Sequence, residues 1–80
     1  MNLYYTYVLH SLKDDQLYIG WTDNLLNRIK AHNSGLVQST KYRIPLKIVY
    51  YEAGLSKDKA IKREKYFKTG FGRRFLKERL

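Results

Sequence analysis

Cysteine is absent from this 80-residue chain. Its absence excludes a disulfide framework, a thiolate metal site and a thiol nucleophile, so carboxylates, imidazoles and water remain as metal ligands. No apolar run approaches the roughly 20 residues that cross a bilayer, and residues 1–10 contain no basic leader segment. We therefore expect a cytoplasmic protein without membrane association. The length predicts one domain, residues 1–80, with a thin core.

Acidic side chains are few throughout the chain, and in its second half basic ones far outnumber them. Residues 1–40 carry three basic and three acidic side chains, whereas residues 41–80 carry thirteen basic and four acidic ones. The whole net charge of +9 therefore lies in the second half. Such asymmetry favours a polyanionic partner, because neutralising phosphates releases condensed counterions. A solubilising surface or attraction to acidic lipid would account for the charge as well.

The order of periodic segments predicts an α+β fold. Aromatic and β-branched residues at 3–10 and 16–22, with turn residues between them, predict an N-terminal hairpin, and residues 46–53 after Pro45 predict a third strand. Thr22 or Asp23 is expected to cap a helix that ends near residue 33, with Gly35 beyond its end. Ser56 is expected to cap a helix to residue 69, followed by a helix over 71–80. The prediction is a small three-stranded sheet flanked by three helices, in the order β-β-α-β-α-α.

The alternation within the hairpin assigns its side chains to two faces. If the loop has an even number of residues, Tyr5 and Tyr7 share a face with Tyr18 and Gly20. The opposite face is more uniformly apolar and suits the core. It would carry Val8, Leu17, Ile19 and Trp21.

The first helix places two polar side chains beside an apolar face. Leu25, Leu26 and Ile29 define that face, and Arg28 and His32 lie one turn apart on one flank. On these residues alone, Arg28 could extend its guanidinium to solvent from the helix edge, and His32 could be a partly exposed boundary residue. The alternative is that both point into a functional cleft.

The second helix carries a carboxylate on its apolar face. Glu64 falls between the positions of Ala60, Ile61 and Phe67, where desolvation is costly unless a cation compensates. One interpretation is an intrahelical ion pair with Lys68, four residues later. The other is a metal ligand that faces a cleft.

At this point the sequence resembles the GIY-YIG nuclease family. Tyr18-Ile19-Gly20 matches the second signature element, and Tyr5-Thr6-Tyr7, followed by Val8-Leu9, stands in place of the first, with Tyr7 eleven residues before Tyr18. The helix arginine of the family falls on Arg28 and a histidine on His32, within LLNRIKAHNSG. The metal-binding glutamate falls on Glu64, within AIKREKYFK. Short stand-alone bacterial members, related to the catalytic domain of the excision-repair nuclease C subunit, have this length and order.

The resemblance implies a chemistry for each of these residues. Glu64 would hold one Mg²⁺ or Mn²⁺ together with water and a phosphate oxygen. Tyr7 would act as general base, its pKa drawn down from about 10 by the metal and Arg28, while Tyr18 positions the water or phosphate. Arg28 would neutralise charge in the transition state. His32 would contact phosphate, assist proton transfer or brace its neighbours.

The expected reaction is endonucleolytic hydrolysis of DNA, structure-dependent and serving repair or recombination. Basic and aromatic residues would hold the substrate backbone without reading sequence. They are Lys41, Tyr42, Arg43, Lys62, Arg63, Lys65, Arg73 and Arg74. One alternative is a catalytically inactive nucleic-acid-binding module, because the late asparagine of many members has no counterpart after Asn33. Another is a basic protein-interaction or ribosome-associated domain.

Overall fold

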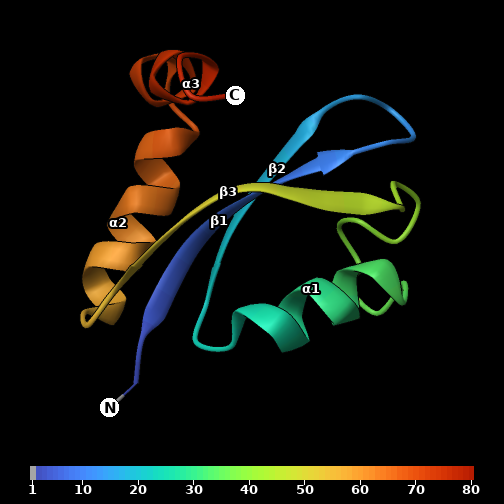
Figure 1. The fold of residues 1–80 in the computed structure, drawn as a ribbon, viewed down its shortest axis with the longest axis horizontal. Helices are drawn as coiled ribbons and strands as arrows, with labels where there is room; N and C mark the ends of the chain where they lie inside the picture. Colours follow the sequence, from blue (N-terminus) through green and yellow to red (C-terminus); the bar gives the residue numbers. More distant parts are fainter. Residues whose placement is uncertain (1) are drawn as a thin grey trace.

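The computed structural model describes residues 2–80, and it has the predicted α+β architecture (Figure 1). The order β-β-α-β-α-α is confirmed. The elements are β1 (Tyr4–Ser11), β2 (Leu17–Thr22), α1 (Leu25–Asn33), β3 (Leu46–Gly54), α2 (Lys57–Phe67) and α3 (Gly70–Lys77). Within residues 2–80, no helix combines the length and the apolar character needed to cross a membrane.

The three strands form one antiparallel sheet in the order β2-β1-β3. Tyr7 pairs with Gly20 and Leu9 with Tyr18, so these side chains share a face, as predicted. Val8 pairs with Ile19 on the opposite face, which is also as predicted. Because β2 is an edge strand, one side of the Tyr18–Gly20 segment has no further strand beside it.

Helices cover both faces of the sheet, and each face has its own core (Figure 1). Against α2 and α3, the buried cluster contains Val8, Ile19, Phe67 and Leu76. Against α1, a second cluster contains Tyr7, Leu9 and Leu46. The sequence indicated a core on the Val8 face alone. The tyrosine face is buried as well, because α1 packs over it.

The helix boundaries differ from the prediction at two capping positions. Asn24, and not Thr22 or Asp23, caps α1, since its side chain accepts a hydrogen bond from the backbone N–H of Asn27 at 3.2 Å. Thr69 caps α3, so α2 ends at Phe67, before the expected residue 69, and α3 begins at Gly70. The cap at Ser56 is confirmed, and Gly35 lies beyond the end of α1, as expected, with a positive φ of +75°.

Candidate active site

The phenol of Tyr7 lies directly over Gly20. Tyr7 is only 1% exposed, and a Cβ atom at position 20 would stand 2.5 Å from its hydroxyl oxygen and 2.7 Å from Cζ. Such contacts are too short for any side chain. Glycine at the third position of the Tyr-Ile-Gly motif therefore lets the phenol from β1 reach across β2, the edge strand.

A line of three buried polar side chains begins at this phenol. The Nε2 atom of His32 is 2.8 Å from the Tyr7 hydroxyl, and Nδ1 is 2.7 Å from the hydroxyl of Thr40. His32 is fully buried, so the expectation of a partly exposed boundary residue is wrong. Burial, together with the charge of Arg28, lowers the pKa of His32 from 6.5 to about 4. The imidazole is therefore neutral at neutral pH.

Tyr18 and Arg28 lie beside Tyr7. The ring centroid of Tyr18 is 6.4 Å from that of Tyr7 and 5.0 Å from that of His32, and its hydroxyl accepts a hydrogen bond from Ser39 at 3.4 Å. Burial raises the pKa of Tyr7 above 10.0, and the Arg28 guanidinium opposes this only in part. Tyr7 is consequently a phenol at neutral pH in the protein alone, whereas the sequence led us to expect a lowered pKa once metal is present.

Glu64 lies on α2 and acts on Tyr7 through its charge. Its side chain is 19% exposed, and its negative charge contributes to the raised pKa of Tyr7. The expected ion pair with Lys68 is present, but at 3.6 Å it is longer than an ideal charged hydrogen bond. Arg28 and Glu64 thus act on one phenol from helices on opposite faces of the sheet. Tyr7, Tyr18 and His32 are in contact here, and Arg28 and Glu64 influence the pKa of Tyr7.

The donor set of this cluster fits one hard, hydrated cation. Within residues 2–80, no group of three or more histidine, cysteine, aspartate or glutamate side chains is arranged to hold a metal. Mg²⁺ keeps several of its waters and often takes only one or two protein carboxylates. A partly exposed carboxylate such as that of Glu64, with only a long contact to Lys68, is compatible with this binding mode.

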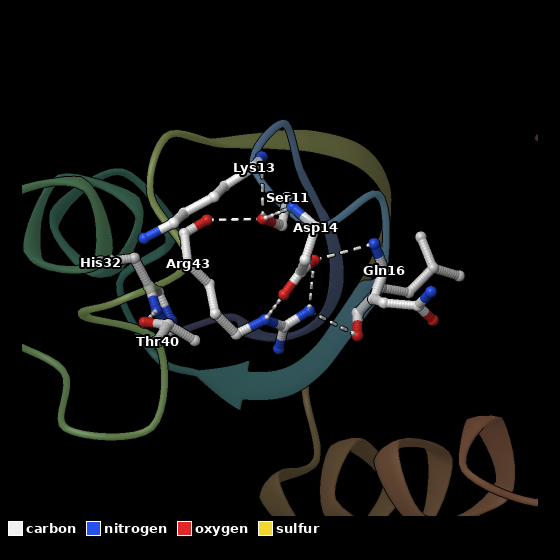
Figure 2. Close-up of polar contacts among 8 residues, drawn as sticks. Ser11, Lys13, Asp14, Gln16, His32, Thr40 and Arg43 are labelled. Carbon is white, nitrogen blue, oxygen red and sulfur yellow. Dashed lines mark hydrogen bonds and ion pairs between the residues drawn. The ribbon is translucent and has the colours of Figure 1, made fainter.

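Arg43 has a structural role that the sequence did not indicate. Its guanidinium is 2.7 Å from the carboxylate of Asp14 and donates to the carbonyl of Leu17 at 3.4 Å (Figure 2). The Ser11 hydroxyl donates to the backbone carbonyl of Arg43 at 2.6 Å. These contacts tie the 34–45 loop to the β1–β2 turn and hold Thr40 beside His32. The hydrogen bond from Arg43 also lowers the pKa of Asp14 to about 2.

Arg63 is likewise engaged inside the protein. Its guanidinium makes two hydrogen bonds to the carboxylate of Glu52, at 2.9 and 3.1 Å. It also lies 4.6 to 4.9 Å from the ring centroids of Tyr66, Phe67 and Phe75. Burial raises the pKa of Glu52, but hydrogen bonds, chiefly from Arg63, outweigh burial and hold it below its ordinary value. We therefore correct the expectation that Arg43 and Arg63 offer free guanidinium groups to a substrate.

The other residues expected to hold the substrate remain accessible. Tyr42, Lys62, Lys65, Arg73 and Arg74 are exposed, and Lys41 is partly exposed with its Nζ 5.0 Å from the ring centroid of Tyr42. A pocket between β2 and α3 concentrates part of this charge. It is lined by Leu17, Gly70, Arg73, Arg74 and Lys77. Within residues 2–80, no ion pair neutralises its three cations.

Comparisons with known proteins agree with the family resemblance of the sequence. The family model of the GIY-YIG catalytic domain matches residues 3–77. A UPF0213 protein of Clostridium perfringens is 49% identical over 65 residues, which are 80% of this chain and 69% of that protein. A UPF0213 protein of Bacillus licheniformis is 43% identical over 68 residues, 84% and 69% of the two chains. The solution NMR structure of a UPF0213 protein from Bacillus halodurans aligns with a TM-score of 0.58 and 32% identity, covering 95% of this chain and 83% of that one.

Proposed function

Because this chain belongs to the GIY-YIG catalytic domain family, a family of nucleases, we propose that it is a metal-dependent endonuclease that hydrolyses phosphodiester bonds in DNA. The observation that carries the proposal is the cluster around Tyr7. The phenol touches His32 and is influenced by Arg28, Tyr18 and Glu64. Residues of β2, α1 and α2 thus contact or influence one phenol, which lies over the edge strand of the sheet.

Each residue of the cluster has a role in this proposal. Tyr7 takes a proton from the attacking water, and Tyr18 orients that water or the phosphate. Arg28 stabilises the charge that grows on the phosphate, a contribution commonly worth about 3 to 4 kcal/mol per donor. A Mg²⁺ or Mn²⁺ ion held by Glu64 and water would polarise the phosphate and favour the phenolate form of Tyr7.

The unpaired cations supply a path for the DNA backbone. Arg73 and Arg74 line the pocket beside Leu17, which precedes Tyr18 in β2 and faces the other side of the sheet. Lys62 and Lys65 extend the positive surface along α2, and the Lys41–Tyr42 pair adds a cation and an exposed ring. Such contacts hold phosphates without reading bases, so we propose cleavage without sequence specificity in DNA repair or recombination.

The decisive test compares two glutamate variants that remove the same charge. Glu64→Gln should lower cleavage of labelled DNA at least about 100-fold, because it removes the metal ligand, while salt-dependent DNA binding persists. Glu78→Gln, on an exposed residue at the end of α3, should cleave as the wild type does. The substrates are duplex, single-stranded and branched DNA, each with Mg²⁺ and with Mn²⁺. A wild type that binds all of them and cuts none would refute the proposal.

A second candidate is a DNA-binding module that keeps the fold without the reaction. The lack of any asparagine after Asn33, where many family members carry one, favours this alternative. It predicts that wild type and Glu64→Gln bind DNA alike and that neither cuts. Tight, salt-resistant binding to a protein, with negligible affinity for naked DNA, would instead favour a protein-interaction domain.

A further inference from the structure

The line Tyr7–His32–Thr40 has more hydrogen-bond donors than hydrogen bonds. In the neutral state, the phenol, the imidazole and the threonine hydroxyl each carry one donor hydrogen. The three groups make two mutual hydrogen bonds, at 2.8 and 2.7 Å. One hydrogen is therefore left over, and its position fixes the direction of both hydrogen bonds.

If Tyr7 donated to Nε2, the hydrogen on Nδ1 would point to Thr40, and the threonine hydroxyl would have to donate elsewhere. Thr40 is fully buried, and within residues 2–80 its hydroxyl makes no hydrogen bond except that to His32. A buried donor without an acceptor costs about 1 to 3 kcal/mol. This direction is therefore unfavourable.

The opposite direction leaves the extra hydrogen on Tyr7. The hydroxyl oxygen of Tyr7 lies over Gly20 in the edge strand, next to the partly exposed Tyr18. Tyr7 is itself only 1% exposed, but the proposed function brings a water or a phosphate oxygen to this hydroxyl, and that oxygen accepts the hydrogen. When Thr40 donates to Nδ1 and Nε2–H donates to Tyr7, the buried threonine hydroxyl has an acceptor. The free donor hydrogen then lies on Tyr7, at the proposed reaction centre.

We propose that Thr40 is a positioning residue that sets the tautomer of His32. Its hydroxyl donates to Nδ1, the ring proton stays on Nε2, and Nε2–H donates to the oxygen of Tyr7. This inference rests on the proposed role of Tyr7 as base. A fixed N–H donor stabilises the phenolate oxygen and therefore favours the form of Tyr7 that takes a proton from the attacking water.

The surrounding loop is built to keep Thr40 in place. Its backbone N–H donates to the carbonyl of Val37 at 3.1 Å, and its own carbonyl accepts from the N–H of Arg43 at 2.8 Å. The side chain of Arg43 is held in turn by Asp14. Figure 2 shows Thr40 beside the imidazole and next to this clamp. An exposed ion pair thereby fixes a buried hydroxyl.

NMR of ring-¹⁵N-labelled histidine tests the tautomer without reference to activity. The chain has two histidines, so a His10→Asn variant assigns the His32 signals. At pH 7 we expect a proton on Nε2 and an unprotonated Nδ1. A proton on Nδ1 in the wild type would overturn the proposal, whether or not the protein cuts DNA. Thr40→Val, which keeps the shape without the hydroxyl, should mix or reverse the tautomers, whereas Thr40→Ser should preserve them.

Cleavage kinetics give the second measurement. Partners that orient a functional histidine typically contribute about 10- to 100-fold, so Thr40→Val should lower kcat by that factor and leave KM nearly unchanged. Thr40→Ser should recover most of the loss. Wild-type kcat in a folded Thr40→Val variant would overturn the proposal. If the wild type cuts no DNA, the proposed function fails by itself, and the wild-type NMR spectrum still decides the tautomer.

Discussion

At the scale of the residue, Gly20 gives the most specific prediction. At position 20 the phenol of Tyr7 fills the space that a Cβ atom needs. Gly20→Ala should therefore displace the Tyr7 hydroxyl and break its hydrogen bond to His32. We expect the free energy of unfolding to fall by about 1 to 3 kcal/mol, as for other overpacked sites, and cleavage to fall at least about 10-fold. Urea denaturation and a cleavage assay measure the two effects.

Gly54→Ala is the matched control. A Cβ atom there meets no atom of residues 2–80 within 4 Å, and position 54 ends β3, outside the pocket beside Leu17. We expect nearly unchanged stability and wild-type cleavage. Equal losses in both variants would show that the effect at Gly20 is a general cost of the methyl group and not a clash with Tyr7.

His32 makes the stability of the protein depend on pH in a defined window. Its folded pKa of about 4 lies below 6.5, so between these values the unfolded chain binds a proton that the folded chain does not. Stability is therefore complete above pH 6.5 and declines as the pH falls toward 4. From pH 7 to 4.5 the wild type should lose about 2 kcal/mol more than His32→Gln. Urea unfolding of both proteins at the two pH values measures the difference, and parallel losses would contradict the lowered pKa.

At this scale the sequence predicted the members of the cluster better than their environments. The spacing of Tyr7, Tyr18, Arg28 and Glu64 matched a known motif, but the helical pattern left His32 at the boundary. Its burial requires Thr40, which lies in a loop without periodicity and carries no signal of its own. The partners of a buried polar group come from tertiary contacts, so the sequence did not indicate Thr40.

At the scale of the element, Arg63 connects α2 to β3 and α3. Removing its guanidinium leaves the partly buried Glu52 without its main partner and opens a gap among three aromatic rings. Arg63→Gln should lower the free energy of unfolding by about 1 to 3 kcal/mol, which for a domain of this size shifts Tm by several degrees. Thermal unfolding followed by circular dichroism measures this shift.

Lys62 provides the control on the same helix. Lys62→Gln removes the same charge from an exposed neighbour and should change stability by less than about 0.5 kcal/mol. It should weaken DNA binding in the folded protein at least as much as Arg63→Gln does. Weaker DNA binding in Arg63→Gln with unchanged stability would instead restore the expectation that Arg63 contacts the substrate.

The elements themselves follow closely from local patterns. Alternation predicted which side chains of the hairpin share a face, and Ser56 and Gly35 marked helix ends because each stands alone among poor candidates. Near α1, three consecutive capping residues precede the helix, and the cap fell on Asn24. Leu26 is 73% exposed because α1 turns its Arg28–His32 flank toward the sheet. Which flank is buried depends on the packing of α1 against the sheet, which the helical pattern alone does not determine.

At the scale of the whole molecule, the basic excess of the second half is divided between two uses. Arg43 and Arg63 hold segments of the chain together, whereas Arg73, Arg74 and Lys77 surround a pocket and form no ion pair with any part of the chain that the structure describes. The sequence gives the total charge, but it cannot separate the two groups, because the acidic partners Asp14 and Glu52 lie 29 and 11 residues away from their arginines.

Because of this division, we expect DNA binding to depend more on where the cations lie than on the net charge of the protein. Two triple variants each lower the net charge by three. One removes the pocket cations (Arg73→Gln, Arg74→Gln and Lys77→Gln), and the other removes exposed lysines outside the pocket (Lys13→Gln, Lys30→Gln and Lys47→Gln). Both are compared in a Glu64→Gln background, so that DNA remains intact during titration.

For the pocket triple, the plot of log binding constant against log salt concentration should become less steep by roughly 2 to 3, since each lost phosphate contact releases one counterion fewer. The outer triple should change the slope by less than about 1, because its lysines touch no phosphate and act only through the long-range field. Fluorescence anisotropy over a range of salt concentrations gives both slopes. Equal slopes in the two variants would mean that DNA responds to net charge alone and that the pocket beside Leu17 does not hold its backbone.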